Sequence, residues 1–185
     1  NSAIGALKAI DATIDNSGTI HAEGDNAVKL DGSGGVGVTG ASITNSGTIS
    51  AGGDEAIYIG NNSSGIAITN SGTITGTGTI NPTSTVPREA AIALATGSGA
   101  TITNTGTIES SGSNLPGISI GDGSANVSNV TITNSGTIAG VGSGNAIRIY
   151  TGSSGTTINV ERDPTFTDGI TFGETASTIV LASNI

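Results

Sequence analysis

Short segments in which apolar and polar residues alternate recur along the chain. In the stretch SITNSGTISAGGDEAIYI (42–59), Ile43 and Ile49 each stand between polar neighbours, and a third short segment, AIYI, closes the unit at 56–59. Alternation with a period of two is typical of β-strands, because successive strand residues point to opposite faces. The intervening Gly and Asn residues favour turns. Each unit therefore predicts three short strands joined by turns.

The pentapeptide NSGTI marks these units. It begins at Asn16, Asn45, Asn70 and Asn134, and a near copy, NTGTI, begins at Asn104. The central glycines, separated by 29, 25, 34 and 30 residues, are Gly18, Gly47, Gly72, Gly106 and Gly136. A constant motif with variable spacing indicates a repeated structural unit with loops of different length.

Strands this short are not stable alone, so the equivalent strands of successive units must stack on one another. The sequence therefore predicts an all-β fold, a right-handed parallel β-helix with three sheets and about six coils, where one coil is one full turn of the chain. The right hand is expected because parallel crossovers are almost always right-handed. We expect residues 1–155 to form the repeat array and residues 156–185 to form divergent terminal coils of the same solenoid.

The period of two also predicts which side chains enter the core. Ile43 and Asn45 share one parity and should point inward, whereas Ser42 and Thr44 should point outward. Stacking then forms three inward columns, which are Ile14/Ile43/Ile68/Ile102/Ile132, Ile20/Ile49/Ile74/Ile108/Ile138 and Leu30/Ile59/Leu94/Ile120/Ile149.

The pentapeptide is predicted to form the corner between the first and second strands of each unit. Its central glycines are expected to have φ > 0, which glycine adopts without steric cost. Its asparagines tolerate turn conformations. Stacked asparagines can also bond amide to amide from coil to coil, and this is expected for Asn16, Asn45, Asn70, Asn104 and Asn134. A ligand-binding role for the same residues is the alternative.

Composition excludes several classes of partner and site. The formal net charge is −9 with five Lys and Arg residues, so the chain lacks the basic surface that nucleic acid or an anionic membrane requires. The absence of Cys excludes disulfides and thiolate metal sites. No apolar stretch is long enough to cross a membrane as a helix, so we expect no membrane insertion by this segment. The chain begins at Asn1 without Met, and we interpret it as an excised piece of a longer protein.

The five pentapeptides, each followed by a segment such as AIYI (56–59) or AIAL (91–94), resemble the passenger domains of bacterial autotransporters and related β-helical surface adhesins. The resemblance covers roughly residues 12–155. It implies a secreted stalk at the bacterial cell surface, outside the outer membrane. The tail segment DGITFGETASTIVL (168–181) resembles the coil that ends such repeat blocks, but Ala176 and Ser177 stand where an acidic residue is expected.

No residue pattern in the chain indicates a cofactor, a metal or a nucleophile. The chain has no G-x-S-x-G motif whose serine the single histidine, His21, could activate as a base. We therefore interpret His21 as a solvated turn residue. The segments GDGS (121–124) and LDGSGG (30–35) supply one carboxylate each, whereas calcium needs several oxygen ligands.

Paired carboxylates could cleave a polysaccharide. Asp54 with Glu55, Asp25 and Glu23 are the candidates. They lie in polar, Gly-rich turns, where we expect charged side chains to face water. We therefore expect no catalytic residue.

One connection departs from the others. The third unit has sixteen residues, Thr75 to Ala90, between its second and third strands, and they include Pro82, Pro87, Arg88 and Glu89. Long insertions in solenoids often carry binding, so this loop is the candidate binding site. The alternative is a tolerated insertion, because added loop length has a small free-energy cost.

Three functional hypotheses remain. The leading one is a non-catalytic stalk or adhesin segment that displays loops to a host or neighbouring-cell surface protein or glycan. The second is a ligand-binding or ice-binding solenoid that uses the outward column Thr19/Thr48/Thr73/Thr107/Thr137, and the third is a polysaccharide-cleaving β-helix. In each case the ends of the solenoid expose unpaired backbone and apolar side chains such as Ile4 and Leu7, so end-to-end self-association is expected.

Overall fold

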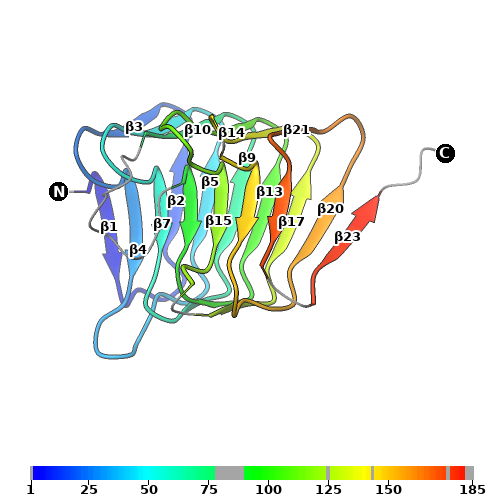
Figure 1. Ribbon diagram of the computed structural model, residues 1–185. Helices are drawn as coiled ribbons and strands as arrows, with labels where there is room; N and C mark the ends of the chain where they lie inside the picture. Colours follow the sequence, from blue (N-terminus) through cyan, green and yellow to red (C-terminus); the bar gives the residue numbers. More distant parts are fainter. Residues whose placement is uncertain (1, 78–89, 124–125, 143, 174–175, 182–185) are drawn as a thin grey trace.

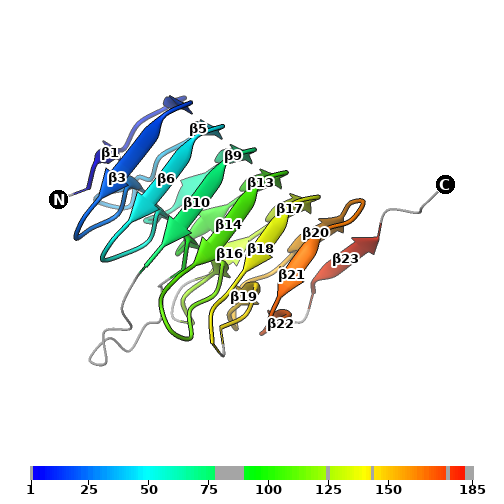
Figure 2. The same ribbon diagram turned by 90° about the horizontal axis from the view of Figure 1, so that it is seen from above.

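The computed structural model describes residues 2–77, 90–123, 126–142, 144–173 and 176–181. Within this part of the chain every regular element is a β-strand, and these strands pair in parallel into four sheets. The strands stack along one axis, with β1 (Ile4–Leu7) and β23 (Thr178–Leu181) at opposite ends of the stack (Figures 1 and 2). The protein is a parallel β-helix, as its repeat pattern predicts.

We name the sheets A to D in the order in which one coil passes through them. Sheet A contains β1 (Ile4–Leu7), β4 (Val28–Asp31), β7 (Ile57–Ile59), β11 (Ile92–Leu94), β15 (Ile118–Ile120), β19 (Ile147–Ile149) and β22 (Ile170–Phe172). Sheet B contains β8 (Ser63–Ser64), β12 (Gly97–Ser98) and β16 (Val127–Ser128). Sheet C contains β2 (Thr13–Asn16), β5 (Ser42–Asn45), β9 (Ala67–Asn70), β13 (Thr101–Asn104), β17 (Thr131–Asn134), β20 (Thr157–Val160) and β23 (Thr178–Leu181). Sheet D contains β3 (Thr19–Ala22), β6 (Thr48–Ala51), β10 (Thr73–Gly76), β14 (Thr107–Ser110), β18 (Thr137–Ala139) and β21 (Thr165–Thr167).

The coils differ from the prediction in number and in detail. Sheets A and C each have seven described strands, so the described chain makes seven coils and not about six. Sheet B is a fourth sheet, which the prediction of three strands per repeat did not include. Isolated parallel bridges extend it, linking Ile10 to Thr39, Thr39 to Ser64 and Ser128 to Ser154. Two-residue strands contain too few residues to show a period of two, so alternation along the sequence cannot reveal them.

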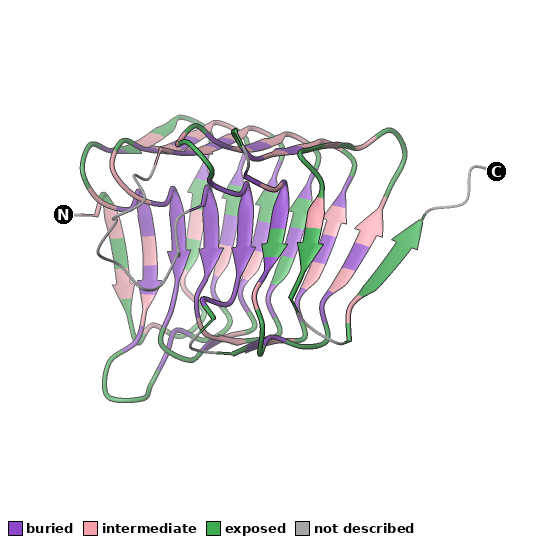
Figure 3. Ribbon diagram, in the orientation of Figure 1, coloured by how far each residue is buried: buried purple, intermediate pink, exposed green. Residues whose placement is uncertain are grey.

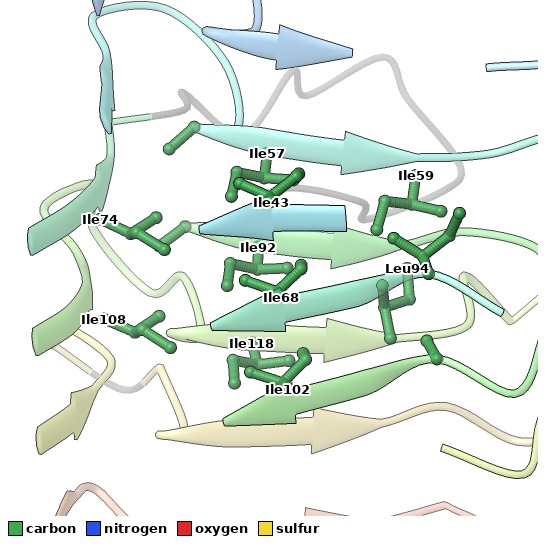
Figure 4. Packing of buried hydrophobic residues seen from close by; sticks show 14 of the residues in the cluster. Ile43, Ile57, Ile59, Ile68, Ile74, Ile92, Leu94, Ile102, Ile108 and Ile118 are labelled. Carbon is green, nitrogen blue, oxygen red and sulfur yellow. The ribbon is translucent and has the colours of Figure 1, made fainter. Parts of the chain in front are cut away.

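The inward columns form as predicted. Ile14, Ile43, Ile68, Ile102 and Ile132 are direct neighbours across sheet C, and the column continues through Ile158 to Ile179. The column in sheet D continues to Phe166, and the column in sheet A continues to Phe172. Figure 4 shows isoleucines from sheets A, C and D meeting in the centre of the coil. Each side chain therefore packs against its equivalent in the next coil as well as across the core.

The outward side chains of sheet A differ from those of sheet C. Tyr58, Ala93 and Ser119 point away from the core but are buried, so the middle strands of sheet A are buried at every position (Figure 3). Tyr58 packs with Ala93 and Ala95 in a second apolar cluster, and Lys29 Nζ lies 5.3 Å from the centre of its ring. On sheet C the outward residues of the middle strands remain exposed or half-buried.

Left-handed backbone occurs at the corner between sheets B and C. One residue in each of the first six coils has positive φ there, and the set is Asp11 (52°), Gly40 (67°), Gly65 (63°), Gly99 (67°), Asn129 (55°) and Gly155 (69°). Gly, Asn and Asp are the residues that adopt this conformation most readily. Each stands two positions before a strand of sheet C, a regularity that the repeated pentapeptide did not predict.

The strands that follow residue 155 extend the same sheets. β20 pairs with β17, β21 with β18, β22 with β19, and β23 with β20. The polar corner changes in this tail, since Val160 and then Leu181 take the place of the asparagine.

Candidate functional site

The asparagines of the pentapeptide form a continuous hydrogen-bonded column at the corner between sheets C and D. The side-chain Nδ2 of each of the first four donates to Oδ1 of the next, at 2.7 Å from Asn16 and at 2.8 Å from Asn45, Asn70 and Asn104. The same Nδ2 also donates to a backbone carbonyl of the next coil, as from Asn70 to Thr107 O at 3.0 Å. These amides are buried and bonded to protein groups, which favours a structural role for them over a ligand-binding one.

The glycines of the pentapeptide do not have positive φ, so that prediction is wrong. The amide N–H groups of Ser46 and Gly47 both donate to Asn16 O, at 2.8 and 3.2 Å, and this draws the two corners close together. A Cβ at Gly47, Gly72, Gly106 or Gly136 would overlap the backbone oxygen of the corresponding glycine one coil earlier. Glycine is required here by the close approach of two backbones, which can be recognised only when two coils are in place.

Replacing Asn70 by alanine should destabilise the fold by about 1–3 kcal/mol, because Asn104 Oδ1 would lose its donor and Asn45 Nδ2 one of its acceptors. Urea unfolding followed by circular dichroism measures the loss. Thr73→Ala is the control, since Thr73 lies in the next strand, half-buried on its outer face, and should change the free energy of unfolding by less than about 0.5 kcal/mol. Equal losses of unfolding free energy in the two variants would show that the side-chain hydrogen bonds of the asparagine column do not stabilise the fold.

An acidic residue is buried at the corner between sheets D and A. Glu55 is 3% exposed and Asn26, in the coil before it, is 2% exposed. Asn26 Nδ2 donates to Glu55 Oε2 at 2.7 Å. The expectation that this carboxylate faces water is therefore wrong for Glu55. The spacing of 29 residues between Asn26 and Glu55 equals that between Gly18 and Gly47, and this shared period identifies the two side chains as neighbours in one column.

The two turns around this pair have opposite effects on their carboxyls. The backbone N–H of Asn26 donates to Asp25 Oδ1 at 2.8 Å and lowers the pKa of Asp25. Burial raises the pKa of Glu55 to about 9, and the neighbouring Asp54 carboxyl adds to the rise. Burial therefore favours the protonated form of Glu55, whose Oε2 accepts from Asn26.

The single histidine contacts a serine and a glutamate on the outer face of sheet D. His21 lies on the outer face of β3 and not in a turn, with Nδ1 2.8 Å from Ser50 Oγ and Nε2 3.4 Å from Glu23 Oε1. Asp122 is buried in the turn after β15. Across the described residues, no three His, Cys, Asp or Glu side chains gather closely enough to hold a metal ion.

The connections from sheet D to sheet A share one edge of the solenoid, which we call the loop edge. Those that follow β14 and β18 extend from this edge in Figure 2. The long connection of the third coil starts from the same edge at Thr77, because Thr75 and Gly76 belong to β10. Thr77 N donates to Ala51 O at 3.1 Å. Pro82, Pro87, Arg88 and Glu89, the candidate binding residues, lie outside the described residues.

The outward threonines of sheet D form the column that the sequence predicted, and it has one more member. Thr19, Thr48, Thr73, Thr107 and Thr137 are neighbours across the sheet, followed by Thr165. On sheet C the outward residues of β5, β9, β13 and β17 are Ser or Thr at every position except Ala67. Both surfaces repeat once per coil, at intervals of about 4.8 Å.

No helix with the length and apolar character of a membrane span occurs in the described residues. We compared the chain with protein-family models, with curated proteins and with solved structures, and none of them matches it.

Proposed function

We propose that the chain is a non-catalytic stalk segment of a secreted bacterial surface protein, an autotransporter-like passenger that displays loops from a rigid β-solenoid. The observation that carries the proposal is the register of the stack. Equivalent residues face one another in sheets A, C and D along the described coils, and the inward positions are filled by packing columns and by bonded asparagines. Such a body holds its length and shape, and its surface loops are free to vary.

The place for recognition in this proposal is the loop edge. The connections there differ in length while the strands around them keep the same register. The partner is a host or neighbouring-cell surface protein or a glycan, bound outside the bacterial cell. The resemblance to autotransporter passengers supports this localisation, and the stacked coils support the mechanical role.

Two variants separate the stalk from the displayed loop. Removing residues 101–130 deletes one whole coil and joins Ala100 to Thr131. Ala100 and Val130 occupy equivalent positions in successive coils, so Thr131 keeps the same kind of predecessor. Replacing residues 78–89 by a short Gly-Ser turn keeps Gly76 and Thr77, which belong to the described edge. Beads carrying each variant are then tested for adhesion to cells.

The coil-deletion variant should fold and keep its adhesion. Its solenoid should be shorter than that of the wild type by about 4.8 Å, as measured by small-angle scattering. The loop-replacement variant should fold equally well, because loop length has a small free-energy cost, and should lose adhesion. Adhesion that survives loop replacement would make the segment a spacer only. Unfolding of the coil-deletion variant would contradict the proposal that the array is a modular stalk.

The threonine columns favour a second candidate function, an ice-binding or other ligand-binding surface. The supporting observation is that Thr101 with Thr103 and Thr131 with Thr133 stand in register on the exposed face of sheet C. Asp15 and Ala67 interrupt the same face. An ice-recrystallisation assay tests this candidate, and unhindered crystal growth would eliminate ice as the ligand.

A further inference from the structure

The outer face of sheet D places the single histidine of the chain against a serine. His21 on β3 and Ser50 on β6 are direct neighbours across the sheet, and His21 Nδ1 lies 2.8 Å from Ser50 Oγ. Both side chains point away from the core, with Ser50 half-buried and the histidine side chain 43% exposed. Small molecules dissolved in water can therefore reach this pair.

Glu23 determines which ring nitrogen carries the proton. Its Oε1 lies 3.4 Å from His21 Nε2. A carboxylate accepts hydrogen bonds, so the Nε2 that faces it is the protonated nitrogen of the neutral ring. Nδ1 then has a free lone pair and accepts from the Ser50 hydroxyl. A hydroxyl bonded to a base that a third group orients is the arrangement that activates serine nucleophiles.

We propose that Ser50 is an acceptor for acyl groups taken from activated esters, namely aryl esters or thioesters. Ser50 Oγ attacks the carbonyl carbon of the donor while His21 Nδ1 takes the hydroxyl proton. The bond from the carbonyl carbon to the leaving oxygen or sulfur then breaks, and the proton passes from His21 to the leaving group. The products are an O-acylated Ser50 and one phenol or thiol, with no change in oxidation state.

The surroundings of Ser50 favour a single acylation over continued hydrolysis. β6 pairs with β3 on one side and with β10 on the other, so in the described strands the backbone amides near Ser50 bond within the sheet and form no oxyanion hole. An aryl or thiol leaving group departs readily without that help. The acyl-serine ester has an alkoxide leaving group, which departs slowly, so the acyl group remains attached. The proposal therefore adds a covalent modification to the stalk and not a catalytic function.

Incubating the full chain with p-nitrophenyl acetate tests the proposal, and peptide mapping by mass spectrometry follows each acetyl group. Ser50 should be acetylated about a hundredfold faster than Ser42, because a positioned general base commonly supplies an effect of this size. Ser42 is the matched control, since it is half-buried on the outer face of the same coil. Its neighbour in the first coil is Thr13, which is not a base, and the two hydroxyl oxygens are 3.4 Å apart.

Three variants assign the roles of the side chains. His21→Gln should reduce the acetylation of Ser50 to the rate of Ser42, and Ser50→Ala should remove the fast release of p-nitrophenol. Glu23→Ala should slow the acetylation and move part of the ring proton from Nε2 to Nδ1, which nitrogen-15 NMR of the single histidine detects. All three should keep the circular dichroism of the wild type, because these side chains lie outside the core.

Four results would overturn the proposal. The first two are equal acetylation of Ser50 and Ser42, and an unchanged rate in His21→Gln. The third is a wild-type ring proton on Nδ1, since the ring would then donate to Ser50 and could not accept its proton. The fourth is release of more than one equivalent of p-nitrophenol per chain that Ser50→Ala abolishes, because it would identify Ser50 as the nucleophile of an esterase.

Discussion

Gly72→Ala should destabilise the protein by about 3 kcal/mol or more, although alanine suits the ordinary backbone angles of this position. The reason is steric, since the new Cβ would overlap the backbone oxygen of Gly47. That oxygen also accepts from Thr73 N at 2.9 Å, so it cannot move aside without breaking a bond between coils. Overpacking against rigid backbone lies at the upper end of the usual range for such substitutions. Chemical denaturation measures the loss.

Gly18→Ala is the matched control for this experiment. Gly18 occupies the same corner in the first coil, but no atom lies within 4 Å of the position its Cβ would take. Alanine should therefore be neutral there, or stabilise by about 0.5 kcal/mol through a less flexible unfolded chain. Equal destabilisation at both positions would show that the corner needs glycine for its backbone angles and not for the approach of the preceding coil.

The second large effect is expected from the buried acid at the loop edge. The pKa of Glu55 is raised from 4.5 to about 9 in the folded protein, so folding favours its protonated form. The stabilisation from this group is complete below pH 4.5 and is lost as the pH rises through 9. Between these values the group should lower the free energy of unfolding by about 1.4 kcal/mol per pH unit.

Glu55→Gln should remove this dependence. Glutamine has nearly the same shape, cannot ionise, and keeps an oxygen that accepts from Asn26 Nδ2. Unfolding measured at pH 5 and pH 7.5 should show the wild type losing about 3 kcal/mol more than the variant. Glu109→Gln, half-buried on the outer face of β14, controls for the loss of one carboxyl from the surface. Parallel pH profiles for the wild type and Glu55→Gln would show that Glu55 is ionised in the folded protein.

The local pattern of the sequence determined the strands of sheets A, C and D, the inward columns and the pairing of asparagines. These features follow from a period of two and from the repetition of NSGTI, because a side chain that repeats once per coil must meet its own copies when the coils stack. Ile43 and Asn45 are inward for this reason. Their neighbours in the adjacent coils follow from the sequence alone.

Only the stacked structure decided features that depend on the distance between coils. The need for glycine at Gly72 arises from the carbonyl of Gly47, and the two are 25 residues apart in the chain. The left-handed corner belongs to a different column, in which Asn129 replaces glycine at a φ of 55°. Glu55 looks like any other turn carboxylate in the sequence, and its pKa rises because the coils around it exclude water. Alternation along the sequence predicts the face of the strand to which a side chain points. Its burial, its contacts with neighbouring backbone and its protonation depend on the residues that the adjacent coil packs against that face.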